Sequence, residues 1–221
     1  MKRFQVAIDG PAGAGKSTVA RQVAKNLGFT FVDSGAMYRA IAWMILQEGG
    51  QVSEPKAYQL AQNSHFSLHP QGVIVNGRVL TDELRSPDVS NLASTIATMP
   101  RVRQALVVKQ QEIAEQESVV MDGRDIGSHV LPNADLKVFL TASIEERAKR
   151  RLEDLAQKGL SVDLETLKTE IAARDLNDQT REFSPLIQAE DAYLLDTTQM
   201  TIPQVVEKIL VLCRTKMGGE E

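Results

Sequence analysis

The sequence predicts an α/β fold with a parallel sheet that helices cover on both faces. Strand, helix, strand and helix patterns alternate over residues 4–47, and such alternation builds parallel sheets. The two opening strands are short apolar runs, as expected of strands that are buried on both faces. The chain has 221 residues, 43% of them hydrophobic, which is enough for one compact core with insertions.

The opening elements follow from apolar periodicity and from glycine. Val19, Val23 and Leu27 recur every four residues and predict one apolar face of a helix, which Gly28 ends. The other elements expected here are a strand at 4–8, a glycine-rich turn at 10–15, a strand at 29–32 and a helix at 36–47.

The pattern changes near residue 53, where short antiparallel strands interrupt the α/β alternation. A helix is expected at 54–63 and a strand at 66–69. The pair Asn76-Gly77 is a strong hairpin signal between runs at 73–75 and 78–80. These features predict an inserted subdomain over residues 54–92.

The rest of the chain returns to helices and buried strands. Pro100 and Pro203 each suit the first turn of a helix. We expect strands at 119–121, 136–140 and 193–195, and helices at 91–98, 101–117, 143–158, 163–177 and 202–213.

Composition excludes several classes of protein. Lys and Arg number 25 against 29 Asp and Glu, so a formal charge of −4 makes a general nucleic-acid binder a poor interpretation. A single cysteine, Cys213, excludes an internal disulfide and a multi-cysteine metal site. No apolar stretch approaches the ~18 residues of a membrane span. We therefore expect a cytoplasmic enzyme or binding protein with no nucleic-acid or membrane partner.

Residues 10–17 match the phosphate-loop pattern, with a strand before it and a helix after it. Glycines let backbone N–H groups turn toward phosphate oxygens, and the following helix directs its positive end at the same anion. Lys16 would reach the β- and γ-phosphates, and the Ser17 hydroxyl would hold Mg²⁺. The predicted ATP site comprises Gly10, Pro11, Ala12, Gly13, Ala14, Gly15, Lys16, Ser17 and Thr18.

The loop occurs in a chain without GTPase or dinucleotide-binding motifs. The strings D-x-x-G, N-K-x-D and G-x-G-x-x-G are absent, so an ATP-dependent kinase for a small molecule is favoured. A hydroxyl acceptor benefits from a carboxylate base, for which Asp33 is the candidate. A phosphate acceptor is already ionised and needs several cations instead. A non-catalytic nucleotide-binding module is the third hypothesis.

Arginines at loop and helix positions favour the phosphate acceptor. Arg147 and Arg151 are like charges four residues apart, which favours an anionic ligand. Arg150 fits equally well as one half of a solvated ion pair with Glu146 or Asp154. The other candidates are Arg39, Arg101, Arg103, Arg124, Arg174 and Arg181.

With these residues in view, the sequence resembles the bacterial cytidylate kinases, a family of nucleoside-monophosphate kinases, over essentially the whole chain. The segments that carry the resemblance are 9–18, 33–39, Ala93-Ser94 with 100–103, 122–125, 146–151, and Arg174-Asp175 with Asp178 and Arg181. The resemblance implies a phosphate-loop kinase fold with a five-stranded parallel sheet. It implies a core of 1–53, 93–144 and 182–221, a monophosphate-binding insert at 54–92 and a lid at 145–181.

The resemblance also implies an activity and a set of site residues. The family transfers the γ-phosphoryl group of ATP to CMP or dCMP with Mg²⁺, and a monomer is expected. Ser34, Arg39 and Arg124 would hold the acceptor phosphate, and Arg174 and Asp178 the sugar. Ser94, Arg103 and Asp125 would bind cytosine, and Lys16, Arg124, Arg147, Arg151 and Arg181 would act on the transferring phosphoryl group.

The implied base recognition agrees with the chemistry of cytosine. Its N4 amino group donates to a carboxylate such as Asp125, whereas uracil would present a carbonyl there. Such a buried mismatch costs ~1–3 kcal/mol, enough to prefer CMP to UMP. Two roles stay open on the sequence alone: Ser94 also fits an ordinary helix-surface serine, and Asp122 fits either a magnesium ligand through water or a turn cap.

Overall fold

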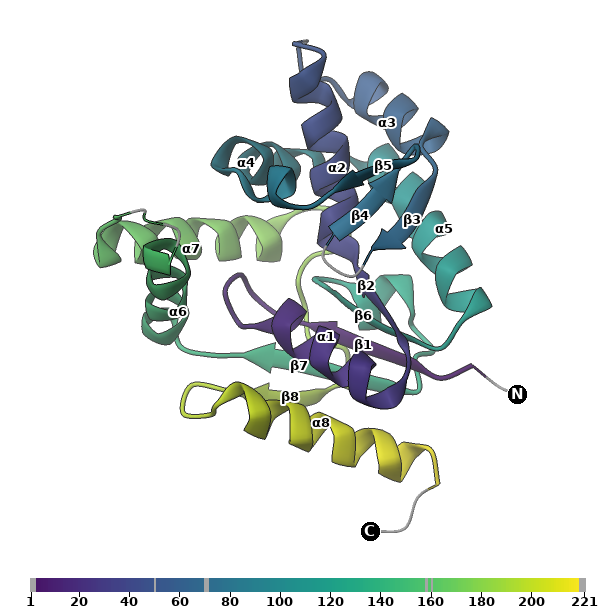
Figure 1. The fold of residues 1–221 in the computed structure, drawn as a ribbon, viewed down its shortest axis with the longest axis vertical. Coiled ribbons are helices and arrows are strands. Elements are labelled where there is room, and N and C mark those ends of the chain that lie inside the picture. Colours follow the sequence, from purple (N-terminus) through teal and green to yellow (C-terminus); the bar gives the residue numbers. More distant parts are fainter. Residues whose placement is uncertain (1–2, 50, 70–71, 158, 160, 219–221) are drawn as a thin grey trace.

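A five-stranded parallel sheet forms the centre of the computed structural model, which describes residues 3–49, 51–69, 72–157, 159 and 161–218 (Figure 1). Every strand pair in it is parallel, as the sequence predicts. The order across the sheet is β2 (Thr30–Asp33), β6 (Val119–Gly123), β1 (Gln5–Asp9), β7 (Leu136–Thr141) and β8 (Tyr193–Asp196).

Helices cover both faces of this sheet because successive strand residues point to opposite sides. Val6 and Ile8 of β1 pack in one core with α1 (Lys16–Leu27) and α8 (Ile202–Lys216). Ala7, between them, packs in another core with α5 (Pro100–Gln116) and the helical turn η2 (Ile126–Val130). Among the helices of the described ranges, none combines the length and apolarity that crossing a membrane requires.

The inserted subdomain predicted over residues 54–92 forms a separate layer beyond the end of the sheet (Figure 1). Helix α2 (Ser34–Gln47) leads into it and shares one core with α3 (Glu54–Asn63), α4 (Pro87–Ile96) and α5. An antiparallel sheet of β3 (Phe66–His69), β4 (Gly72–Val75) and β5 (Arg78–Leu80) packs on α2 and precedes the turn η1 (Asp82–Arg85). Asn76 and Gly77 both have positive φ, as the tight hairpin requires. Residues 70–71 lie outside the described part.

Two further helices, α6 (Ile144–Gln157) and α7 (Leu164–Thr180), pack against each other through Ala148, Leu167 and Ile171. They lie at the end of the sheet where β1 and β7 terminate (Figure 1). The expected lid, 145–181, coincides with this helix pair, except that residues 158 and 160 lie outside the described part.

Helix ends differ from the predicted ones where a cap sets the boundary. Helix α2 begins at Ser34, two residues early, because the Asp33 carboxylate accepts from Ala36 N at 2.8 Å. Helix α4 begins at Pro87 and not at 91, because Ser86 Oγ accepts from Val89 N at 3.3 Å. Helix α7 continues three residues beyond the predicted end at 177, and the turns η1 and η2 were not predicted.

Candidate functional site

The phosphate loop joins β1 to α1 and adopts the conformation that its glycines permit. Gly10, Gly13 and Gly15 all have positive φ, the conformation that favours glycine. A Cβ on Gly10 would lie 1.9 Å from Leu140 O, so any side chain there would collide with the backbone of β7. The sequence-predicted loop therefore forms at the carboxyl end of the central strand, where open α/β sheets bind ligands.

Lys16 is buried at the start of α1, and its Nζ donates to Pro11 O at 2.7 Å. Its pKa falls well below the usual 10.5 because burial disfavours the ammonium ion and Arg124 and Arg174 repel it. An anion bound at the loop would relieve both effects.

The Ser17 hydroxyl donates to Asp122 Oδ2 at 2.7 Å. Asp122 is the last residue but one of β6, and its other oxygen, Oδ1, is buried without a hydrogen-bond partner among the described residues. Burial, and then the negative charge of Asp33, raises the pKa of Asp122 to about 7. These hard oxygen donors fit Mg²⁺, which is typically held by one or two protein groups together with substrate phosphates. The described residues contain no cluster of three or more acidic, His or Cys ligands.

Arg39, Arg124, Arg151 and Arg174 come from different elements and lie near one another, and carboxylates pair with only two of them, Arg39 and Arg124. Burial, and then repulsion from Arg124, Arg39 and Arg151, lowers the pKa of Arg174 to about 10. Within the described residues, Arg151 and Arg174 have neither a hydrogen bond nor an ion pair. Such mutual repulsion predicts strong binding of a polyanion.

The residues expected to bind the acceptor phosphate follow β2 and β6, and those expected to bind the sugar, Arg174 and Asp178, lie on α7. Ser34 Oγ donates to Asp122 O at 2.7 Å, so phosphate binding there requires exchange of this bond. Arg39 pairs with Asp33 at 2.7 Å. Arg124 Nε donates to Asp178 Oδ2 at 2.6 Å, which brings two predicted residues together. Although burial alone would raise the pKa of Asp178, Arg124, Arg174 and Arg181 hold it below its usual value.

The residues expected to bind the base form a second, buried cluster. Arg103 pairs with Asp125, and the Arg103 guanidinium lies 5.6 Å from the ring centre of Tyr38. Arg181 also lies beside Asp125, at 3.5 Å, and thus belongs to this cluster and not to the arginines of α6. Ser94 lies one turn before Ala97, whose carbonyl accepts from Arg103 at 3.1 Å. The structure thus places Arg103, Asp125 and Arg181 in contact, with Ser94 on the neighbouring helix.

Arg147 and Asp175 connect the α6–α7 pair to the phosphate loop. Asp175 pairs with Arg147 at 2.6 Å and accepts from Ala12 N at 3.2 Å. Arg147 donates to Ala12 O at 2.8 Å and to Ala142 O at 3.0 Å. The expected phosphoryl ligand Arg147 is therefore buried against the loop, while Arg151 on the next turn is exposed.

We expect Asp175→Ala to lower the free energy of unfolding by about 3–5 kcal/mol, because the buried Arg147 would lose its partner. Urea unfolding followed by circular dichroism measures the loss. In the double variant Arg147→Met/Asp175→Leu, most of this stability should return, since no buried charge is left unpaired. A loss below about 1 kcal/mol in the single variant would contradict this role.

Two other arginines have structural partners. Arg150 pairs with Glu146 at 3.0 Å and donates to Thr197 O at 2.8 Å, which confirms the ion-pair interpretation. Arg101 lies over the ring of Tyr58 at 4.2 Å and thereby joins α5 to α3.

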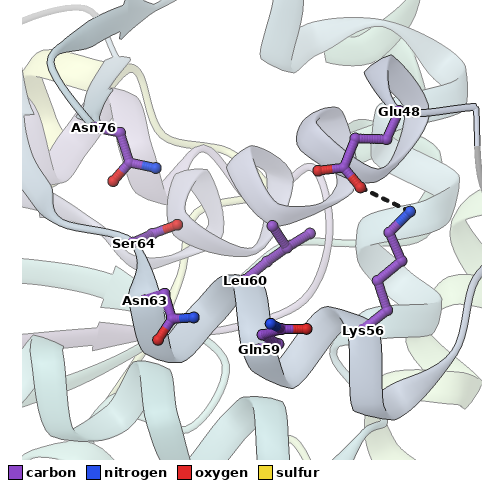
Figure 2. Close-up of a pocket in the computed structure, with 7 residues that line it drawn as sticks. All are labelled: Glu48, Lys56, Gln59, Leu60, Asn63, Ser64 and Asn76. Atoms are coloured by element: carbon purple, nitrogen blue, oxygen red, sulfur yellow. Dashed lines mark ion pairs between the residues drawn. The ribbon is translucent and has the colours of Figure 1, made fainter.

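Hollows in the described part of the chain also lie away from the phosphate loop. Figure 2 shows one of about 240 Å³ between α2, α3 and the turn at Asn76, where Lys56 pairs with Glu48 at 2.8 Å. Its lining includes none of the predicted site residues. A second hollow, of about 350 Å³, opens beside Arg181 between the α4–α5 connection and the end of α7.

Sequence reasoning gave no role to Asp9, Tyr38 or Asp175. In the sequence Asp175 is noted only as the neighbour of Arg174. A single acidic residue on a polar helix does not indicate which residue it will pair with. Asp9 directly precedes the loop. An acidic residue at the end of an apolar strand could have been predicted to be buried and to need a hydrogen-bond partner. Tyr38 lies within segment 33–39, one of the segments on which the resemblance rests, but no role was assigned to it.

Comparison with known proteins agrees with this geometry. The family model for cytidylate kinase matches residues 6–215. A cytidylate kinase of Streptococcus pneumoniae (strain 70585) is 51% identical over 98% of this chain and 100% of its own length. One of Oceanobacillus iheyensis is 50% identical over 95% and 93%. A gluconokinase structure from Sinorhizobium meliloti 1021 has a TM-score of 0.51 at 15% identity over 98% and 97% of the two chains, which supports the fold alone. The match to the family model over residues 6–215, together with relatives about 50% identical over nearly the whole chain, shows that the chain belongs to the cytidylate kinase family.

Proposed function

We propose that this protein transfers the γ-phosphoryl group of ATP to CMP and dCMP. The observation that carries the proposal is the cluster of Arg39, Arg124, Arg151 and Arg174 near Lys16, in which carboxylates pair with only two of the four arginines, Arg39 and Arg124. Burial, and then repulsion between these cations, lowers the pKa of both Arg174 and Lys16. Two nucleotides approach each other only where cations offset their phosphates. An ionised phosphate acceptor needs no strong base, and this cluster supplies none.

Each group of residues takes one part of the work. The glycine loop and Lys16 hold the β- and γ-phosphates of ATP, while Arg39 and Arg124 hold the acceptor phosphate, which fixes the reacting groups close together. Asp178 and Arg174 hold the sugar, and Ser94, Arg103 and Asp125 bind cytosine. Arg151 reaches the transferring group from α6, and Arg181 stays with the base cluster in this arrangement.

Magnesium, when bound, offsets the negative charge on the phosphates of ATP. Ser17 and Asp122 are the groups proposed to hold it, because their oxygens face each other at 2.7 Å and Asp122 Oδ1 is left without a partner among the described residues. This favours the magnesium role for Asp122 over that of a turn cap.

We expect Asp122→Asn to raise the Mg²⁺ concentration for half-maximal activity about tenfold or more. The amide can still accept from Ser17 but carries no charge for the metal. Titration of Mg²⁺ at saturating ATP and CMP gives the value, and the exposed Asp154→Asn on α6 is the matched control. An unchanged Mg²⁺ requirement in Asp122→Asn would contradict the assignment.

An acceptor panel tests the proposed function. ADP release is measured with CMP, dCMP, UMP, AMP, GMP and shikimate under identical conditions. We expect CMP and dCMP to give the highest kcat/KM. UMP or AMP strongly outperforming CMP would overturn the base assignment, and turnover with shikimate alone would overturn the phosphate acceptor.

A hydroxyl acceptor with Asp33 as base is disfavoured by the surroundings of Asp33. Its Oδ1 accepts from Ala36 N, and its Oδ2 is paired with Arg39. Both oxygens thus have structural partners, one that caps α2 and one that holds Arg39.

The division into a core, an insert at 54–92 and a lid at 145–181 is part of the proposal, and so are a cytoplasmic location, a monomeric state and the absence of a nucleic-acid partner. The packing of α6 on α7 around Ala148, Leu167 and Ile171 supports the lid as a unit with its own small core. Lid closure over both nucleotides would exclude water from the transfer.

A further inference from the structure

Asp9 is a buried carboxylate to which the proposed reaction gives no part. It ends β1, and its two oxygens accept from Ile126 N at 2.8 Å and from Gly127 N at 2.7 Å. These N–H groups open the turn η2, and the first N–H groups of a helical turn have no partner within it. Asp9 therefore supplies, from a distant part of the chain, the cap that η2 needs.

Asp125 occupies the position that would ordinarily provide this cap. It directly precedes η2, and an aspartate there usually accepts from an N–H two or three residues later. In this structure the Asp125 side chain makes no such bond. It pairs with Arg103 and lies 3.5 Å from Arg181. Asp9 thus holds the first two N–H groups of η2, Ile126 N and Gly127 N, while the Asp125 carboxylate is directed at the two arginines.

We propose that Asp9 is a positioning residue for recognition of the acceptor base, which it serves by capping η2 in place of Asp125. The inference rests on the proposed function, because it concerns how Asp125 distinguishes cytosine from uracil. Without Asp9, Asp125 would turn back to its own helical turn and withdraw from the base cluster.

The surroundings of Asp9 suit a rigid support. Strand β1 lies between β6 and β7, and Asp9 is aligned with Gly123 on one side and Phe139 on the other. Gly127 approaches closely, since a Cβ there would lie 3.1 Å from Lys137 and 3.4 Å from Asp9 Oδ2. Burial raises the pKa of Asp9 to about 6, although the two backbone bonds oppose this. At about pH 8 the carboxylate is ionised and both oxygens accept.

Asp9→Asn tests the proposal, because the amide keeps one acceptor and directs an NH₂ group at the second backbone N–H. Values of kcat/KM for CMP and UMP are measured at about pH 8. We expect the CMP-to-UMP ratio to fall about tenfold, with KM rising more for CMP than for ATP. In an Asp125→Ala background, Asp9→Asn should change the ratio less than about twofold, because its effect passes through Asp125. Equal losses for both acceptors, with the ratio kept, would overturn the proposal.

Two further variants separate positioning from general loss of stability. Gly127→Ala should lower the same ratio, because the added methyl group pushes η2 away from Lys137 and Asp9. Thr201→Ala removes the cap of α8, on the other face of the sheet, and should leave the ratio unchanged. If the wild-type protein shows no preference for CMP, the proposed function fails. If it prefers CMP and both Asp9→Asn and Gly127→Ala keep that preference, only the role of Asp9 fails.

Discussion

Lys16→Ala is expected to lower kcat at least about 10³-fold with every acceptor, a larger effect than we expect from any other single substitution at the site. Lys16 is the buried lysine of the loop, and burial, followed by repulsion from Arg124, lowers its pKa, so a bound anion would stabilise its charged form. Its removal takes away positive charge where negative charge moves between phosphates. Steady-state ADP release with CMP, dCMP and UMP measures the loss.

The variant should fold, because an alanine leaves only the loop carbonyl of Pro11 without its donor. Lys25→Ala, an exposed lysine in the last turn of the same helix, is the matched control and should keep wild-type kcat. A kcat for Lys16→Ala within about tenfold of the wild-type value would mean that the loop does not hold the transferring phosphoryl group.

Asp125→Ala is expected to lower the preference for CMP over UMP roughly 5- to 150-fold, the range that ~1–3 kcal/mol of lost discrimination represents. Asp125 is the carboxylate of the base cluster, held by Arg103 and Arg181. Without it, the N4 amino group of cytosine loses its acceptor and the uracil carbonyl loses a repulsive neighbour. The ratio of the two kcat/KM values measures the change.

This ratio is insensitive to a uniform loss of active protein, which matters because Arg103 is buried and would lose its partner. Glu115→Ala removes an exposed carboxylate from the distal part of the same helix as Arg103, α5, and should leave the ratio unchanged. A preference for CMP that survives in Asp125→Ala would assign base recognition to other residues.

Much of the fold was predictable because it depends on local patterns. The apolar runs predicted all five strands of the parallel sheet, and Asn76-Gly77 predicted the hairpin between β4 and β5. Errors occur at helix ends of both kinds: α2 and α4 start early because Asp33 and Ser86 form caps, and α7 ends three residues later than predicted. The turn η2 was not predicted because its cap, Asp9, lies 117 residues away from Ile126.

The candidate site was predictable as a set of residues but not as an arrangement. The loop spacing identified Lys16 and Ser17, their positions identified the arginines, and the resemblance supplied the roles of most of these arginines. Nothing in the sequence indicated that Arg147 would be buried against Ala12, or that Arg181 would join Asp125. Each of these contacts depends on how separate elements pack. The sequence of one helix does not show which residue of another helix its charged side chain will pair with.

By itself the sequence determined the phosphate loop, the α/β alternation and the number of arginines available to the site. These features depend on residue type and on spacing over short stretches of the chain. Only the tertiary structure decided which carboxylate faces which cation or donor: Asp122 faces Ser17, Asp175 holds Arg147, and Asp9 caps the turn beside Asp125. The physical reason is that an unpaired buried charge is costly. The partner of each buried charge is therefore the group that tertiary packing brings next to it, and not a neighbour in the sequence.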